Sequence, residues 1–479
     1  MTKNKIESAS RKRCKKFETK IEKKFKLEPV RKPELNLPNE ILLKIVNYLN
    51  TKDVITNFAL VCKNFKCLAK EVKYFELKDI TELEFESAME VLENTTHLKE
   101  ISLSIKSKKN NLMNELLIQA LKSSKRIKSI KLWPTRYLGD SDWANYKLDN
   151  VKEIKKYCKD LEHLTLIDVE IGSSLITQIT KFSTLKSLNV SIQSNVNDGK
   201  FTSNHILAFA NNCPNLEAIS FYIKIGYNNI KHMKAALDTF FDARKQTLKS
   251  FALSTIRSSR KDYWDMDGSC LLENLFLCHN LEALLIRWLN LQSSTLEAIS
   301  TSFPKIRTLV LDRVKSISQT EIEPSITSTL KHLVLKSSDI DFNLFTSMKF
   351  PVLERLAVIS SGNLKSSRIH FSQMYKLIDN ATRMKSIQLH GNDFQRDEEY
   401  KTMSLQFCKE RDIFLSFGTY SNNDLDRISC AFTEENIKFQ NDFEKNLEPI
   451  YKSKYGDLKN KFITWDDINK WWTWAMEHV

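Results

Sequence analysis

A short apolar pattern recurs along most of this chain, and it constrains the fold more than any other feature. Two apolar residues stand three positions apart, and a third follows two positions later. Eleven copies occur between residues 98 and 389, about 29 residues apart on average. A unit this short cannot bury its apolar face alone, so neighbouring units stack and share one core. The copies begin at Leu98, Ile127, Leu161, Leu185, Leu216, Leu248, Leu281, Ile306, Leu330, Leu353 and Met384.

Each copy predicts a strand, and the stretches between copies predict helices. Residues 112–121 and 205–210 show apolar residues at helical spacing. Three of the nine prolines also share one register, because Pro214, Pro304 and Pro351 each stand two residues before the first apolar residue of a copy. The sequence therefore predicts an α/β chain folded as a curved solenoid over residues 78–419, with about eleven or twelve irregular repeats and with the strands on the concave face.

The alternation of side chains along a strand predicts which residues face the concavity. The central concave positions are polar in the first five copies and apolar in the next five, from Ala252 to Ala357. We expect this apolar strip to become buried only when a protein segment covers it, although β-propensity alone would select the same residues. The candidate target-binding residues are Trp133, Tyr222, Leu285, Arg287, Val310, Asp312, Val334 and Lys336.

A separate helical unit precedes the repeats at residues 35–77. Pro38 and Glu40 suit the first turn of a helix, and Ile41, Leu42 and Ile45 begin one apolar stripe. A second helical stretch follows from Thr51 with more apolar surface than about 40 residues can bury alone. The unit therefore needs a partner or a neighbouring domain.

These residues resemble an F-box. The resemblance rests on the segment 37–42, on Ile45, Tyr48-Leu49 and Asp53, on Leu60-Val61-Cys62-Lys63 with Phe65, and on Leu68-Ala69 followed by Phe75. Phe65 and Phe75 stand where members of the family commonly have Trp. With the repeats that follow, the chain resembles F-box proteins with C-terminal leucine-rich repeats.

The resemblance implies a three-helix F-box that binds a Skp-type adaptor and, through it, a cullin. The solenoid would then hold a target protein for ubiquitination, so the chain would be a non-catalytic subunit of an SCF-type ubiquitin ligase. About half of the candidate adaptor-binding residues are expected to touch the adaptor, and the others to form the core of the unit. These candidates are Leu37, Pro38, Ile41, Leu42, Ile45, Leu49, Leu60, Val61 and Phe65.

The two ends of the chain differ from the repeats. Residues 1–34 hold 13 of the 73 Lys and Arg against 5 Glu, and carry +8 of the net charge of +14. This segment reads as a disordered basic tail, and the run Arg11–Lys16 also fits a nuclear-import signal. In residues 420–479, the segment from Thr464 to Val479 predicts a helix that caps the solenoid, with a Trp-rich partner-binding helix around Trp471 and Trp472 as the alternative.

Composition argues against several other functions. The nine glycines are never closer than 27 residues, which excludes the glycine-rich loops of nucleotide-binding proteins and of many hydrolases. The nine cysteines include no Cys-x-x-Cys pair, as expected for free thiols in the cytoplasm or the nucleus. Cys278 beside His279 fits a core position better than a catalytic dyad. No secretory signal or membrane span is predicted, and neither a catalytic site, a metal site nor a cofactor is expected.

Two other functions remain open at this point. An F-box protein with repeats can act as a scaffold outside ubiquitination. A protein associated with nucleic acid through its basic tail is the other alternative, and it is disfavoured because the remaining 445 residues carry only +6. The target protein is not readable from these patterns.

Overall fold

The computed structural model describes most of the repeat region and neither end of the chain. The described residues are 72–80, 82–105, 111–132, 146–148, 151–167, 169–170, 173–191, 201–225, 229–257, 267–316, 329–336, 349–359, 371–390, 411 and 413–418. The predicted adaptor-binding residues, the basic tail and the C-terminal helix lie outside this set, as does Trp133.

The described strands form one sheet in which spatial order follows chain order. Thirteen strands take part, and every neighbouring pair is parallel. They are β1 (Tyr74–Ile80), β2 (Glu100–Ile105), β3 (Ser129–Leu132), β5 (His163–Ile167), β7 (Ser187–Ser191), β8 (Ala218–Ile225), β9 (Ser250–Arg257), β10 (Ala283–Arg287), β12 (Thr308–Asp312), β14 (His332–Lys336), β15 (Arg355–Ile359), β16 (Ser386–His390) and β17 (Phe414–Gly418).

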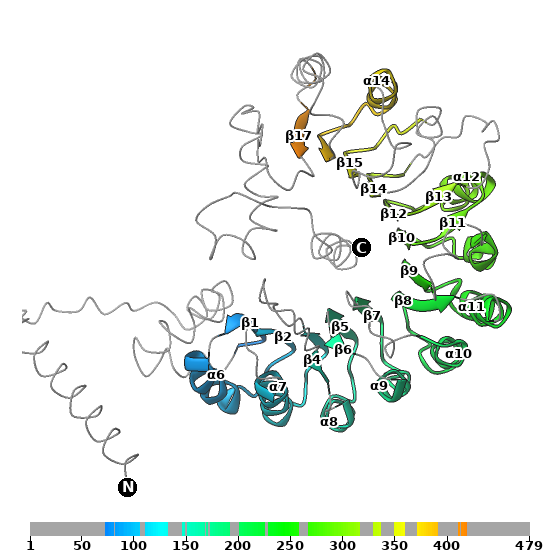
Figure 1. Ribbon diagram of the computed structural model, residues 1–479. Coiled ribbons are helices and arrows are strands. Elements are labelled where there is room, and N and C mark those ends of the chain that lie inside the picture. The colour runs from blue at the N-terminus through cyan, green and yellow to red at the C-terminus, as the bar shows by residue number, and fades with distance from the viewer. Residues whose placement is uncertain are drawn as a thin grey trace, which may run out of the picture.

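Helices return the chain from the end of one strand to the start of the next. Figure 1 shows the strands along the inside of an arc and the helices along its outside. The described helices are α6 (Glu82–Asn94), α7 (Asn111–Ser123), α8 (Val151–Tyr157), α9 (Ser173–Ile179), α10 (Ser203–Asn212), α11 (Ile230–Arg244), α12 (Ser293–Ser302) and α14 (Phe371–Asp379), with the 3-10 turns η2 (Ser269–Leu271) and η3 (Glu273–Leu277). Two small parallel pairs flank the sheet, β4 (Tyr146–Lys147) with β6 (Val169–Glu170) and β11 (Asn290–Leu291) with β13 (Lys315–Ser316). The predicted α/β leucine-rich-repeat solenoid is confirmed.

All eleven sequence copies are strands of this sheet, and the structure adds one repeat before them. Val72, Phe75 and Leu77 have the same spacing and are buried; Phe75 and Leu77 belong to β1, and Phe75 pairs with Ile101 of β2. The sheet therefore begins at Tyr74. Phe75 matched the closing stretch of the F-box by sequence, and here its side chain lies in the repeat core.

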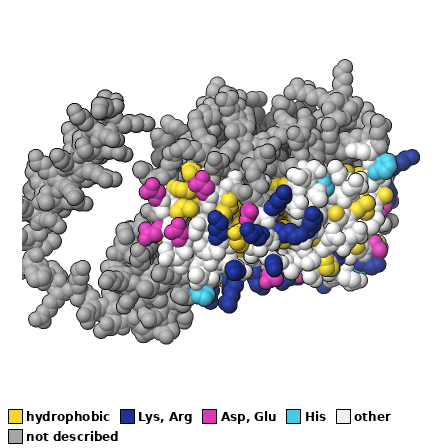
Figure 2. Space-filling model, turned by 90° about the horizontal axis from the view of Figure 1, so that it is seen from below, with side chains coloured by type: hydrophobic (Ala, Val, Ile, Leu, Met, Phe, Trp, Pro, Cys, Tyr) yellow, Lys and Arg dark blue, Asp and Glu magenta, His cyan; other side chains and the backbone are white. Residues whose placement is uncertain are grey.

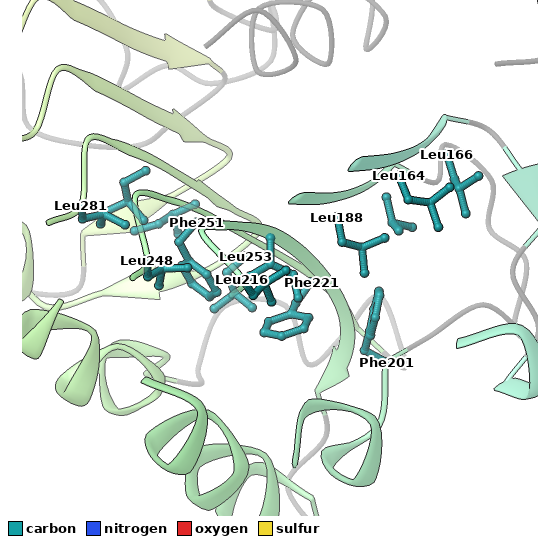
Figure 3. Packing of buried hydrophobic residues seen from close by; sticks show 14 of the residues in the cluster. Leu164, Leu166, Leu188, Phe201, Leu216, Phe221, Leu248, Phe251, Leu253 and Leu281 are labelled. Atoms are coloured by element: carbon teal, nitrogen blue, oxygen red, sulfur yellow. The ribbon is translucent and has the colours of Figure 1, made fainter. Parts of the chain in front are cut away.

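The main core lies between the sheet and the helices. The first ten copies each contribute their three apolar residues, and the last contributes Met384 and Ile387; with the facing apolar stripe of the helices, the cluster runs from Phe75 to Ile413. The core between β8, β9 and α11 is aromatic: the ring centroids of Phe221 and Phe240 are 5.1 Å apart and those of Phe241 and Phe251 are 5.0 Å apart, both edge to face. Figure 3 shows Phe221 and Phe251 among the leucines between strands and helices. Such contacts stabilise aromatic pairs beyond their burial, by about 1 kcal/mol each.

The recurrent cysteine position is a packing position. Cys213 and Cys278 are fully buried in the turn that leads into a strand, and Cys158 occupies the same place in an earlier repeat. Burial raises the pKa of all three thiols to about 12, so they are protonated at neutral pH. The Sγ of Cys213 lies 3.5 Å from the carbonyl oxygen of Phe182 in the previous repeat. The prediction that Cys278 is a core residue is confirmed.

Candidate interaction surface

The concave face of the sheet has the residue alignment that the sequence predicted. Strand pairing places Ser220, Ala252, Leu285, Val310, Val334, Ala357 and Gln388 in one row across seven strands. In the earlier repeats the same row continues through Ser102, Lys131, Thr165 and Asn189. The next row joins Tyr222, Ser254, Arg287, Asp312, Lys336, Ile359 and His390. The copies found in the sequence are therefore in the correct register.

The apolar strip on this face differs from its prediction in one respect, because it is already buried. Leu285 is 5% exposed, Val310 is 1% exposed and Val334 is 5% exposed. They form a second cluster with Ala252, Ala283 and Ala357, separate from the main core. In-register side chains on neighbouring strands stand about 5 Å apart and cover each other's flanks. The expectation that these three side chains are exposed until a partner covers them is therefore wrong, and their role in target binding stays a prediction.

The charged residues next to the strip are buried as well. Arg287 and Asp312 occupy paired positions on β10 and β12, with Nε of Arg287 3.6 Å from Oδ2 of Asp312. Asp312 has no exposed surface, and Arg287 is 9% exposed. Burial lowers the pKa of Arg287, and the negative charge of Asp312 opposes that shift. These two candidate target-binding residues therefore form a buried ion pair with each other.

Two residues that the sequence analysis did not single out follow directly on these strands. Trp288 has φ of 58° and Arg313 has φ of 53°, a left-handed conformation that is uncommon for residues other than glycine. The guanidinium of Arg313 lies 4.0 Å from the centre of the Trp288 ring. The NH of Trp288 also donates to the carbonyl oxygen of Asp312, at 2.9 Å. These contacts join the ends of β10 and β12. In the sequence, Trp288 and Arg313 could have been related only by aligning the two repeats, because each residue directly follows its strand.

The polar half of the concave face is partly closed by its own hydrogen bonds. The hydroxyl of Ser220 donates to the carbonyl oxygen of Val190 at 3.0 Å, and it lies 3.3 Å from Oδ1 of Asn189. Thr165, Asn189 and Ser220 are all buried. Among the described concave positions, Tyr74, Glu100 and His163 are exposed; Tyr74 pairs with Glu100, whereas the buried Ser129 of β3 lies between Glu100 and His163. The accessible part of this face is therefore at its N-terminal end.

A row of charged residues runs along the rim of the solenoid where the strands begin. In each repeat this residue donates its NH to the carbonyl oxygen of its counterpart in the previous repeat, at 2.6 to 2.9 Å. The row, which we call the rim ladder, comprises Lys73, Lys99, Lys128, Glu162, Lys186, Glu217, Lys249, Glu282, Arg307, Lys331, Glu354 and Lys385. The sequence signal was present, because the residue after the first apolar position of every copy is charged, but the sequence analysis missed it.

Opposite charges pair along the rim ladder. Glu162 accepts from Lys128 and, at 2.7 Å, from Lys186. Glu217 pairs with Lys249 at 2.8 Å, and Glu354 pairs with Lys385 at 2.9 Å. The two lysine hydrogen bonds lower the pKa of Glu162 to about 2, with Lys128 contributing most. A carboxylate whose pKa falls on folding stabilises the folded state.

We expect Glu162→Gln to lower the free energy of unfolding by about 1 kcal/mol at pH 7, because partly exposed pairs contribute little individually. The loss should shrink as pH falls from about 4.5 towards 2, since the unfolded state then binds the proton first. Urea unfolding at pH 7 and at pH 3.5 measures both effects. Glu115→Gln is the control, since Glu115 is exposed and has no ion pair within the described residues. Equal losses for the two variants would contradict the role of the ladder.

The described part of the chain offers no candidate metal site. No group of three His, Cys, Asp or Glu side chains there has the arrangement of a metal site. None of the helices described is long and apolar enough to cross a bilayer.

The N-terminal unit matches a known domain family. Residues 35–77 match the F-box domain family. The match ends inside β1, so the F-box segment and the first strand of the solenoid share residues 74–77. The chain has no match among curated proteins.

Solved structures with similar shape are distant. An internalin from Listeria monocytogenes is 11% identical with a TM-score of 0.37, covering 79% of this chain and 93% of its own. The leucine-rich-repeat protein LegL7 from Legionella pneumophila is 12% identical with a TM-score of 0.34, covering 80% of this chain and 100% of its own. A protein from Bacteroides fragilis is 12% identical with a TM-score of 0.28, covering 74% of this chain and 75% of its own.

Proposed function

We propose that this chain, an F-box domain at residues 35–77 followed by a leucine-rich-repeat solenoid, is the substrate-recognition subunit of an SCF-type cullin–RING ubiquitin ligase. The F-box would bind a Skp-type adaptor, and the solenoid would hold the target protein. F-box domains generally serve as adaptor-binding modules without catalytic activity. The observation that carries the proposal is the direct passage of the F-box segment into the first strand of the solenoid.

That passage matters because an intervening linker would leave the target's position undefined. The sheet begins at Tyr74, three residues before the F-box match ends. β1 pairs with β2 over five residue pairs, and Phe75 packs in the core. A target held on the solenoid would therefore keep a fixed distance from the adaptor, as transfer of ubiquitin to a bound protein requires.

The target contacts are proposed at the accessible end of the concave face. Tyr74, Glu100 and His163 are exposed there and come from three of the first four strands of the sheet, β1, β2 and β5. Tyr74 is 52% exposed, and an exposed aromatic side chain in a polar surface is a common anchor for a protein partner. Tyr222 and Lys336 remain candidates from the original set, and a role of Leu285, Val310, Val334, Arg287 and Asp312 in target binding stays a prediction that their burial disfavours. We also propose that the protein acts in the cytoplasm or the nucleus.

We expect the double substitution Leu37→Ala and Pro38→Ala to abolish adaptor binding while the repeats stay folded. Both residues open the F-box helix in the sequence, and removing a buried leucine costs roughly 2–5 kcal/mol. Co-purification of the adaptor and cullin with the wild type and the variant measures the effect. Unchanged recovery of the adaptor would contradict the assignment. Recovery of the adaptor without cullin from the wild type would favour a scaffold outside ubiquitination.

The matched control is the pair Leu277→Ala and Tyr375→Ala. Both are exposed apolar residues of the solenoid, so the control removes similar apolar surface far from the F-box in sequence. It should leave adaptor recovery unchanged.

A further inference from the structure

One face of the solenoid carries an excess of positive charge that the repeat pattern does not explain. Figure 2 shows Lys and Arg side chains gathered in the middle of the outer face, next to an acidic group. The basic side chains come from the end of α7, from α8, and from the turns after α7, α8 and α9, and all are exposed. This basic surface consists of Lys122, Lys125, Arg126, Lys128, Lys152, Lys155, Lys156, Lys159 and Lys181.

Few acidic side chains balance this surface. Lys128 pairs with Glu162, and Lys156 lies 3.8 Å from Glu153. Among the described residues, no ion pair involves the other seven bases. On the outer face of the later repeats, more of the bases are paired: Lys234 binds Asp238 and Glu273, and Lys245 binds Asp242, while Lys231 and Lys305 have no ion pair among the described residues. The excess is therefore local to the first repeats.

The arrangement works against stability within α8. This helix has only seven residues, Val151–Tyr157, and three of them are lysines. Lys152 stands three and four positions before Lys155 and Lys156, and like charges at these spacings destabilise a helix by a few tenths of a kcal/mol per pair. A charge cluster that costs stability and has little internal compensation points to an external anion.

The chemistry of the surface favours one class of anion. Eight of the nine bases are lysines, which act as point charges and do not read base edges as paired guanidinium groups do. Tyr157 is half-buried under the ammonium of Lys156, at 4.9 Å, so it offers no platform for base stacking. The exposed large apolar residues of the described chain, Tyr74, Leu277 and Tyr375, all lie elsewhere in the sequence, which argues against membrane insertion.

We propose that the basic surface binds an extended acidic polypeptide segment. It spans three consecutive repeats, and adjacent packed helices are about 8–10 Å apart, so its length is about 20 Å. An extended chain covers this length with about six to eight residues. The partner segment is therefore short and rich in Asp and Glu, and it binds the outer face, away from the concave face.

The test compares two charge-reversal variants of the full chain. One carries Lys152→Glu, Lys155→Glu and Lys156→Glu. The matched control carries Lys231→Glu, Lys245→Glu and Lys305→Glu, which are exposed bases of later repeats. Both variants change the net charge equally and keep the basic tail, so the tail contributes the same background to both. Melting curves establish that both variants are folded, and a Lys→Gln version of the first triple replaces it if reversal prevents folding.

The probe is a fluorescein-labelled octaglutamate peptide, with fluorescence anisotropy as the readout at 50 and 200 mM NaCl. We expect at least a tenfold loss of affinity in the first triple variant, less than a twofold loss in the control, and weaker binding at high salt. Absence of wild-type binding, or equal affinities in all three proteins, would overturn the proposal. A loss seen only with an eight-nucleotide DNA strand or with phosphatidylserine vesicles would also overturn it and assign the surface to that partner. None of these measurements needs the adaptor, so the outcome is independent of the proposed ligase role.

Discussion

Replacing Leu285, Val310 and Val334 together by Ser should unfold much of the solenoid. The three side chains are buried in their own cluster on the concave side of the sheet. Removing one large buried side chain costs about 2–4 kcal/mol, and each new hydroxyl adds the cost of burying a polar group. The combined loss should be about 6 kcal/mol or more, a large part of the 5–15 kcal/mol that stabilises a typical domain. Because the residues are neighbours, the losses need not add exactly as independent terms do.

Urea unfolding followed by circular dichroism measures this effect. The control replaces Glu100 and His163, exposed residues on the same face, by Ser. We expect the control to keep the wild-type midpoint and to bind the target less well, if these residues belong to the target-binding surface. A triple variant with the wild-type midpoint would show that the strip is an open binding surface after all.

Breaking the buried ion pair should have the second-largest effect. Asp312→Ala leaves the guanidinium of Arg287 buried without its carboxylate partner, and such a change costs about 3–5 kcal/mol. Most of this loss is the desolvation of the remaining charge, so it should disappear when both charges are removed. We therefore expect the double variant Arg287→Met with Asp312→Leu to recover most of the stability.

The exposed pair of Lys245 and Asp242 provides the comparison. Its atoms are 2.9 Å apart, yet both side chains are largely open to solvent. Asp242→Ala should change the free energy of unfolding by less than about 1 kcal/mol. Similar losses for Asp242→Ala and Asp312→Ala would mean that burial of the Arg287–Asp312 pair does not determine its energy.

These two expectations change where recognition is sought. The candidate residues at the centre of the concave face are buried, whereas the accessible positions lie on β1, β2 and β5, early in the repeat region. A protein bound there would contact the repeats that are nearest to the adaptor-binding unit in the chain. The basic outer surface occupies these same early repeats, so both proposed interactions involve the first third of the solenoid.

The sequence alone determined the repeat architecture and its register. The spacing of three apolar residues identified eleven of the thirteen strands, and the concave rows derived from it are the rows that the strands form. This succeeds because the period reflects contacts within one repeat, where chain neighbours are also neighbours in space. The resemblance of residues 35–77 to an F-box is confirmed by the family match, while the adaptor-contact residues stay predictions.

Only the tertiary structure decided what each concave residue does. Leu285 and Tyr74 occupy the same face, yet one is buried and the other is half exposed. The pairing of Arg287 with Asp312, the rim ladder and the gathering of lysines on α7 and α8 all join residues about 20 to 35 positions apart. Such contacts depend on how consecutive repeats stack and on what covers them. The pattern within one repeat gives neither the distances between side chains of different repeats nor their burial. Only the tertiary structure could therefore distinguish residues that stabilise the solenoid from residues that are accessible to a partner.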